Sequence, residues 1–151
     1  MTPISMTPSV MPASLEVLRV SPEAVLPTRA HAGDAGMDLY GLEDVILGAR
    51  QGKMARTGIA MAIPHGFVGM IADRSSLGKK GVKTAGGIVD AGYRGEVQVI
   101  LWNLTDTEIR LAKGERIAQM LIYPIAAPAV VEVKSLDETK RGAGGFGSTG
   151  K

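Results

Sequence analysis

Apolar residues in this chain come in short runs, each the length of a β-strand and each bounded by Gly, Pro or Asp. No window keeps the 3.6-residue period of an amphipathic helix over three turns. Gly makes up 20 of the 151 residues, well above the usual share of about 7%. The pattern predicts an all-β chain, a barrel or sandwich of many short strands. The predicted strands cover residues 15–20, 45–47, 58–63, 67–72, 97–102, 117–125 and 129–133.

One run, VQVILWNL at 97–104, is apolar on both faces. On an extended strand Val97, Val99 and Leu101 share one face. Ile100 and Trp102 lie on the other. Strands of this kind are buried on both sides. In a chain of 151 residues, a second subunit is a natural source of the second cover, so the run predicts an oligomer.

Composition excludes several classes of function. The chain has no Cys and two His, which excludes disulfides, thiolate chemistry and a His-rich metal site. A formal net charge of +2 does not favour a stable nucleic-acid or membrane partner, but it suits a small anionic ligand. Residues 1–14 lack a signal-peptide pattern and are predicted to form a disordered extension. With no targeting signal in view, a cytoplasmic location is expected.

Two polar, Gly-rich segments carry acids and cations in the first half of the chain. AGDAGMDLY at 32–40 places Asp34 and Asp38 four residues apart, with Asp38 at the entry to a strand. Asp and Gly are also turn residues, so plain turn chemistry is the alternative. DRSSLGKKG at 73–81 offers Arg74, Ser75 and Ser76, a combination typical of an anion-binding loop. The alternative there is a solvated loop.

The segment GGIVDAGYRGEV at 86–97 looks like a β-hairpin whose turn holds an acid and an aromatic residue. Asp90 is a candidate general base, and the ring of Tyr93 can stack on a sugar or a base. A plain hairpin with an Asp turn is the alternative.

Two later segments complete the set. In KGERIAQMLI at 113–122, Arg116 and Gln119 are three residues apart and are predicted to face opposite sides of a regular strand. RGAGGFGSTG at 141–150 is too rich in Gly for a stable helix or a core strand. It nevertheless offers a cation, an aromatic ring, two hydroxyls and free backbone N–H groups.

Taken in order, the five segments resemble the five motifs of the homotrimeric deoxyuridine triphosphatases (dUTPases), over roughly residues 25–150. The resemblance implies a jelly-roll-like subunit of short strands, assembled as a trimer whose active sites are shared between chains. It divides the chain into a β-domain at 15–138 and a Gly-rich mobile arm at 139–151 that closes over a neighbouring active site. The implied reaction is hydrolysis of dUTP to dUMP and pyrophosphate, which limits uracil incorporation into DNA and supplies dUMP for thymidylate synthesis.

The resemblance also assigns roles to residues. Asp90 would be the general base, and Asp38 would assist a substrate-borne Mg²⁺ through water. Tyr93 would pack under the deoxyribose and exclude a 2′-hydroxyl. The backbone from Thr84 to Val89 would read the uracil edge. The substrate-binding residues implied in total are Arg74, Ser75, Ser76, Thr84, Gly87, Ile88, Val89, Tyr93, Gln98, Gln119, Arg141, Phe146, Gly147, Ser148 and Thr149.

The segment before Asp90 departs from the family pattern. Sixteen positions separate Arg74 from Asp90, fewer than is common in the family, and residues 83–85 stand where an Asn is frequent. Two other functions share this fold. A dCTP deaminase needs a Glu that moves protons at the pyrimidine, but the aligned position here is the aliphatic Ile100. A non-catalytic nucleotide-binding module would be free to lose Asp90 or the tail, and both are present.

Overall fold

The computed structural model describes residues 10, 13–148 and 150, and within them it is built almost entirely of β-strands. The all-β prediction is therefore confirmed. The predicted extension at residues 1–14 lies largely outside the described residues. The elements are β1 (Glu16–Arg19), β2 (Met37–Tyr40), β3 (Val45–Leu47), β4 (Gly52–Arg56), β5 (Ile59–Ala62), β6 (Phe67–Ala72), α1 (Ser75–Gly78), β7 (Val82–Ala85), β8 (Ile88–Val89), β9 (Gln98–Asn103), β10 (Ile109–Leu111) and β11 (Arg116–Pro124).

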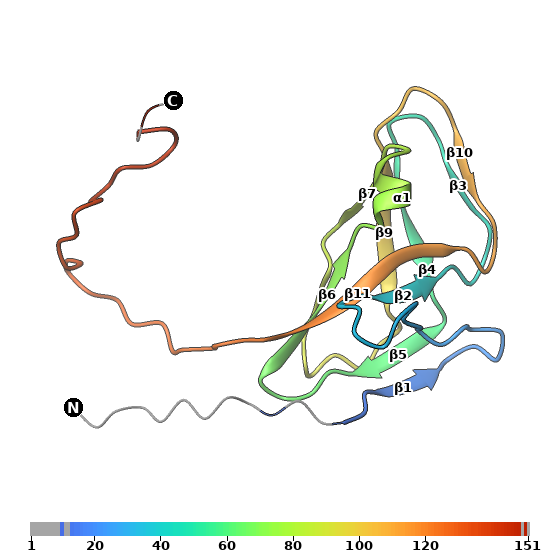
Figure 1. Ribbon diagram of the computed structural model, residues 1–151, viewed down its shortest axis with the longest axis horizontal. Helices are drawn as coiled ribbons and strands as arrows, with labels where there is room; N and C mark the ends of the chain where they lie inside the picture. The colour runs from blue at the N-terminus through green and yellow to red at the C-terminus, as the bar shows by residue number, and fades with distance from the viewer. Residues whose placement is uncertain (1–9, 11–12, 149, 151) are drawn as a thin grey trace.

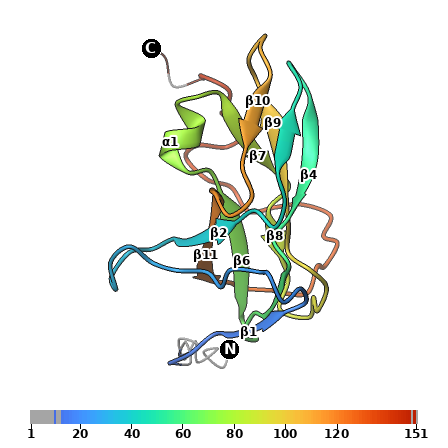
Figure 2. The same ribbon diagram turned by 90° about the vertical axis from the view of Figure 1, so that its right-hand side faces the viewer.

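The strands form two main antiparallel sheets and two shorter ribbons (Figure 1). One sheet has the order β2-β11-β6-β8, and the other has the order β4-β9-β7. The ribbons pair β1 with β5 and β10 with β3. Figure 2 shows β9, β7 and β4 on one side of the body, with β6 and β11 beside them. In this order β2 and β8 are the two opposite edges of the same sheet, so residues on them lie far apart in a single chain.

The core between the sheets is aliphatic. Its largest fully buried side chains include Leu39 on β2, Met120 on β11 and Leu101 on β9. On β9 burial alternates along the strand, as a pleated strand with one covered face requires. The second apolar face is open in the single chain, because Trp102 is 43% exposed and Ile100 is half-buried. That face is the one for which a second cover was expected.

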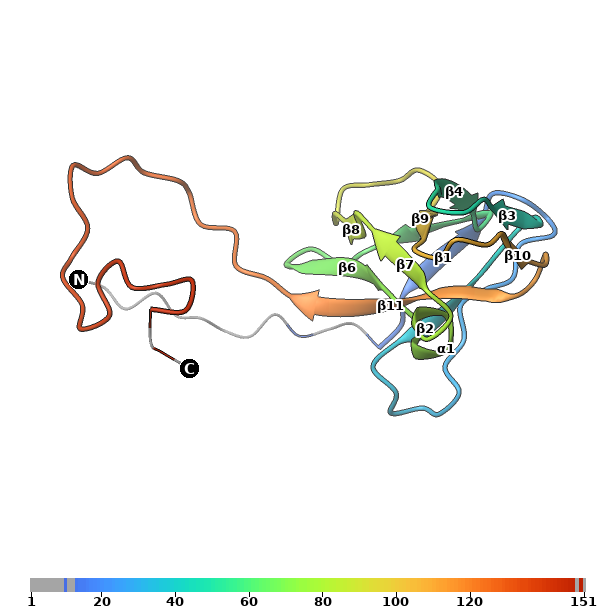
Figure 3. The ribbon, with the colours of Figure 1, turned by 90° about the horizontal axis from the view of Figure 1, so that it is seen from above.

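Beyond β11 the chain leaves the body and runs as an extended segment (Figures 1 and 3). The strand predicted at 129–133 is wrong for the single chain, because this stretch pairs with nothing that the structure describes. A strand needs a partner edge to satisfy its backbone groups, and alternation of apolar residues does not provide one. Val130 is 100% exposed and Val131 is 75% exposed, so these side chains are uncovered.

Candidate functional site

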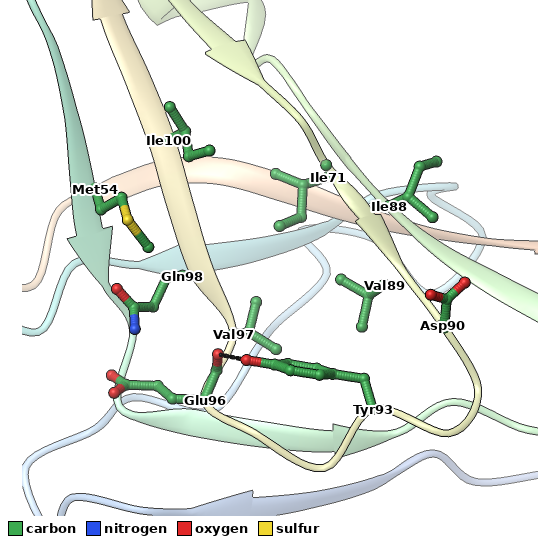
Figure 4. Close-up of a pocket in the computed structure, with 11 residues that line it drawn as sticks. Met54, Ile71, Ile88, Val89, Asp90, Tyr93, Glu96, Val97, Gln98 and Ile100 are labelled. Atoms are coloured by element: carbon green, nitrogen blue, oxygen red, sulfur yellow. Dashed lines mark hydrogen bonds between the residues drawn. The ribbon is translucent and has the colours of Figure 1, made fainter.

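A pocket beside Asp90, here called the Asp90 pocket, lies at the junction of the two sheets (Figure 4). Asp90 directly follows β8 and is exposed, while the pocket wall behind it is apolar. The β-hairpin predicted around Asp90 does not form, because the strands on either side of Asp90 do not pair with each other. β8 pairs with β6, whereas β9 pairs with β4 and β7. The loop after Asp90 therefore crosses from one sheet to the other. The pocket is lined by Met54, Ile71, Gly87, Ile88, Val89, Asp90, Tyr93, Glu96, Val97, Gln98 and Ile100.

The Tyr93 ring is held in place by its own loop. The Tyr93 N–H donates to the Asp90 carbonyl at 3.1 Å, and its hydroxyl donates to the Glu96 carbonyl at 2.8 Å (Figure 4). A Cβ on Gly95 would press into the Tyr93 ring, so glycine is what lets the ring lie flat there. Glu96 in turn accepts from the Gly58 N–H at 2.8 Å and pairs with Arg56 at 3.2 Å. The loop therefore presents Asp90 and an aromatic face on a fixed frame.

The segment from Thr84 to Val89 forms another side of this region. It leaves β7 in one sheet and enters β8 in the other. Gly86 and Gly87 turn the backbone with φ of 68° and 98°, values that favour glycine. The Ile71 N–H donates to the Gly87 carbonyl at 2.7 Å, which fastens the turn to β6. Gly87, Ile88 and Val89 line the Asp90 pocket, and Thr84 lies just outside it.

A second pocket, here called the Arg74 pocket, is polar and lies at the β2 edge of the larger sheet. The Arg74 Nε donates to Asp38 Oδ1 at 3.0 Å, and an Arg116 nitrogen lies 3.6 Å from Asp38 Oδ2. A guanidinium nitrogen of Arg74 also donates to the Ser76 hydroxyl at 3.3 Å, and Ser75 opens the helical turn α1. Two arginines around one carboxylate suit an anion with several oxygens. The pocket is lined by Ala30, Asp34, Ala35, Gly36, Asp38, Arg74, Ser75, Arg116 and Gln119.

Arg116 and Gln119 both line this pocket, so the prediction that they face opposite sides is wrong. The reason is a register shift in β11 between Arg116 and Ala118, where the pairing with β2 slips. Such a bulge reverses the alternation of side chains for the residues that follow. The Gln119 amide nitrogen donates to the Asp73 carbonyl at 2.7 Å, which fixes the side chain toward the pocket.

Asp73 joins the Arg74 loop to β7. Its Oδ1 accepts from the Thr84 N–H at 2.7 Å and from the Thr84 hydroxyl at 2.6 Å, and its Oδ2 accepts from Lys83 Nζ at 2.6 Å. Partial burial raises the pKa of Asp73, but the bonds from Lys83 and Thr84 and the Lys83 charge outweigh burial. The net pKa lies below the usual 3.8.

The lowered pKa predicts how stability depends on pH. Because the folded-state pKa is below the unfolded value of 3.8, the Asp73 contribution is present above that value and is lost as pH falls through the lower one. We therefore expect the free energy of unfolding of the wild type to exceed that of Asp73→Asn by a constant amount at neutral pH. The gap should shrink below about pH 4. Urea unfolding followed by circular dichroism from neutral to acid pH measures it. A gap that does not change on acidification contradicts the prediction.

The two pockets share no lining residue. Asp38 is on β2, and Asp90 follows β8, at opposite edges of the four-stranded sheet. Three strand spacings of about 4.8 Å separate those edges by roughly 14 Å. A single chain therefore keeps its candidate base apart from its candidate anion pocket.

The C-terminal residues lie away from both pockets. Figure 1 shows the segment after β11 running clear of the body to the C-terminus. Arg141 Nε donates to the Gly144 carbonyl at 2.8 Å, and Phe146 is fully exposed. Gly147 and Ser148 follow in the same exposed turn. Thr149, which was also expected to bind substrate, lies outside the described residues.

Neither pocket is a metal cage. Within residues 10, 13–148 and 150 there is no group of three or more His, Cys, Asp or Glu side chains placed to hold a metal ion. The Arg74 pocket does contain two carboxylates, Asp34 and Asp38, beside its arginines. This set fits a hydrated Mg²⁺ brought in by phosphate oxygens, since Mg²⁺ keeps several waters in such sites.

Among the charged residues in and beside these two pockets, sequence reasoning did not assign Asp34, Asp73, Glu96 or Arg116 as ligands. Asp34 and Arg116 lie within segments that resemble the family motifs, so their charge could have marked them as candidate ligands. Asp73 directly precedes Arg74, but its contact with Thr84 depends on the meeting of two sheets.

None of the helices within the described part of the chain has the length and apolarity needed to cross a membrane.

Comparisons with known proteins agree with the fold and the motifs. A family model described as dUTPase matches residues 22–150. The deoxyuridine 5'-triphosphate nucleotidohydrolase of Mycolicibacterium gilvum is 49% identical over 149 residues, covering 93% of this chain and 97% of that protein. That of Nocardia farcinica is 50% identical over 136 residues, covering 87% of this chain and 82% of that protein.

Solved structures extend the comparison to three dimensions. The Staphylococcus bacteriophage 80alpha dUTPase with dUpNHpp superimposes with a TM-score of 0.87 at 31% identity, covering 93% of this chain and all of that one. A mutant dUTPase from phage phi11 of S. aureus, described with a structural Mg(II) ion, gives a TM-score of 0.76 at 27% identity, with coverage of 81% and 97%. With 129 residues matched by the family model and a relative 50% identical over 136 residues, the chain belongs to the dUTPase family.

Proposed function

We propose that this chain hydrolyses dUTP to dUMP and pyrophosphate. The observation that carries the proposal is the Asp90 pocket, where an exposed carboxylate stands beside a fixed aromatic ring and an apolar wall. The Arg74 pocket supplies the cationic and amide groups that a triphosphate needs. The names of the relatives and the nucleotide analogue in the phage enzyme support the same substrate.

The Asp90 pocket would take the nucleoside. The backbone between Thr84 and Val89 would pair with the uracil edge and leave no room for a thymine methyl group. The Tyr93 ring, held by its bond to the Glu96 carbonyl, would pack under the deoxyribose and exclude a 2′-hydroxyl. Gln98 lines the same pocket and would donate to the nucleotide from β9. Steric exclusion by fixed walls is how such a small difference in substrate becomes selectivity.

Asp90 would act as the general base. Its carboxylate takes a proton from a water molecule as that water's oxygen forms a bond to the α-phosphorus. The bond from the α-phosphorus to the bridging oxygen breaks, and pyrophosphate leaves with that oxygen and its electron pair. Arg74, Ser75, Ser76 and Gln119 would hold the phosphate oxygens, so that the charge on the leaving group is already neutralised.

Mg²⁺ would enter with the triphosphate. It would neutralise negative charge on the phosphate oxygens. Asp38 would contact its water shell and is already oriented by Arg74 at 3.0 Å. This role asks for one carboxylate and no cage, which fits the donor set of the Arg74 pocket.

We further propose a trimer with shared active sites, and the separation of the two pockets in one chain supports the sharing. Asp90 of one chain and the phosphate-binding side chains of another could meet only if the β8 edge of one subunit packs near the β2 edge of the next. The open β9 face with Trp102 and the uncovered Val130 provide apolar surface for such contacts. The chain would then divide into a β-domain at 15–138 and an arm at 139–151, whose Phe146 lies over the uracil of a neighbour. Arg141, Gly147, Ser148 and Thr149 would meet the phosphates.

A substrate panel tests the reaction. We expect Mg²⁺-dependent pyrophosphate release from dUTP, and none comparable from UTP, dTTP or dCTP. Ammonia is assayed in the dCTP reaction, because ammonia release would favour a deaminase. Ile100 lines the Asp90 pocket where a deaminase needs a titratable group, so no ammonia is expected. No turnover of any nucleotide would favour a non-catalytic binding module instead.

Substitution of Gly36 tests the role of Gln119. A Cβ on Gly36 would overlap the Gln119 amide oxygen, so the Gln119 side chain must move aside and lose its bond to the Asp73 carbonyl. The amide would then leave its position in the Arg74 pocket. For Gly36→Ala we expect kcat/KM for dUTP to fall about tenfold, the size of one lost charge-assisted hydrogen bond, with the melting temperature lowered by only about 2–4 °C. The matched control is Gly33→Ala, where nothing lies within 4 Å of the added Cβ. Equal kinetics in both variants would remove Gln119 from phosphate binding.

A further inference from the structure

The Asp73 carboxylate ties the two sheets together, and none of the roles above uses it. Asp73 directly follows β6, which belongs to the larger sheet. Its partners Thr84 and Lys83 lie on β7, which belongs to the smaller sheet. Three hydrogen bonds of 2.6 to 2.7 Å cross this junction. The Asp73 side chain is 31% exposed, so these bonds are partly shielded from water.

The same junction determines the shape of the Thr84–Val89 segment. At its far end the segment pairs with β6 through Ile88 and Val89, and the Ile71 N–H holds Gly87. At its near end Thr84 pairs with β9 in the smaller sheet, and the bonds to Asp73 join it to the end of β6. Between them the chain turns through Gly86 and Gly87, which have few steric limits of their own. The glycines permit the turn but do not hold it. Of these contacts, the bonds to Asp73 are the ones that join the β7 end of the segment directly to β6, so they contribute to the distance between its two ends.

We propose that Asp73 is a positioning residue that sets the nucleobase preference of the site, with Lys83 and Thr84 as its partners. The inference rests on the proposed function, in which the segment from Thr84 to Val89 reads the uracil edge. Uracil and thymine differ by one methyl group, and a pocket rejects a group of that size by about 10- to 200-fold only while its wall stays in place. Without the Asp73 contacts the wall can move, and a methyl group can enter.

Steady-state kinetics of Asp73→Ala tests the proposal. We expect KM for dUTP to rise about tenfold, and the ratio of kcat/KM for dUTP to that for dTTP to fall about tenfold, because bonds to a charged acceptor are lost. The kcat for dUTP should stay within about threefold, since Asp90 and Arg74 are untouched. The control is Asp106→Ala, which removes an exposed carboxylate paired with Arg50 at 2.8 Å, at residues that line neither pocket. A purely structural Asp73 would lower the melting temperature of the variant but leave KM and the ratio unchanged.

A second variant keeps the test decisive if Asp73→Ala does not fold. Lys83→Met removes the ion pair and leaves both Thr84 bonds to Asp73 in place. We expect a shift in the same direction of about threefold, as for a partly exposed pair. Lys113→Met, which removes a similar pair with Glu23 at 3.0 Å, is its control. If the wild type hydrolyses dUTP but the folded variants keep its KM and its ratio of kcat/KM for dUTP to that for dTTP, the Asp73 inference alone is overturned. Absence of wild-type turnover overturns the proposed function as well.

Discussion

Replacing Asp90 with Asn should reduce kcat for dUTP by about 1,000-fold, within the range that a positioned general base contributes. Asn keeps the size of the side chain, and the bond from the Tyr93 N–H goes to the Asp90 carbonyl, which the substitution leaves in place. The amide cannot take a proton from the attacking water. Binding should change little, because the uracil edge and the phosphate groups are read by other residues. Pyrophosphate release measures kcat, and equilibrium binding of the non-hydrolysable analogue dUpNHpp measures affinity.

A matched substitution separates the loss of the base from a general loss of charge. Asp106→Asn removes a carboxylate that pairs with Arg50 at 2.8 Å and lines neither pocket, so its kcat should equal that of the wild type. If Asp90→Asn keeps kcat within tenfold of the wild type, Asp90 is not the base. If it instead loses affinity for the analogue while kcat is retained, Asp90 binds substrate and the base must be sought elsewhere.

Strand prediction succeeded for contiguous apolar runs in the body of the protein, and it failed at an exposed edge strand and in the segment after β11. The run at 67–72 coincides with β6, and the run at 97–102 is one residue from β9, because central strands bury most of their side chains. The edge strand β4 was missed, because four of its five residues are exposed and leave no apolar run. The opposite error arose at 129–133, where the pattern is apolar but the chain has no partner edge within the described residues.

The sequence singled out residues that line the two pockets, but it did not predict how those residues are arranged. Asp90, Arg74 and Gln119 stand in short segments whose residue types suggest chemistry. Their distribution over two pockets follows from the strand order β2-β11-β6-β8, which no local pattern encodes. The common orientation of Arg116 and Gln119 depends on one bulge in β11, and a single register shift is invisible to a rule based on alternation. The contact of Asp73 with Thr84 likewise requires the two sheets to be in place.

Removing residues 141–151 should reduce kcat/KM for dUTP by about 100-fold, the cost of poor positioning of bound groups. Phe146 is fully exposed, so its ring has no cover in the single chain and is free to lie on a nucleobase. Arg141 bonds only to a neighbouring carbonyl among its described contacts, so its charge is available to a phosphate. Closure of such an arm also excludes water other than the attacking molecule. The truncated protein should bind dUpNHpp more weakly and keep its melting temperature.

The oligomeric state of the truncated protein shows whether the arm acts as a lid or holds the subunits together. The apolar surface that we expect to join subunits lies at Trp102 on β9 and at Val130, before the cut. The trimer should therefore survive truncation, as measured by light scattering coupled to size exclusion. Phe146→Ala in the full-length chain should reproduce part of the kinetic loss, since stacking on a base contributes about 1–3 kcal/mol. Deletion of Gly150 and Lys151 alone should change nothing, because neither carries a group assigned to substrate. Monomers after truncation would mean that the arm holds subunits together, and the loss of activity would then report loss of the shared site instead of loss of a lid.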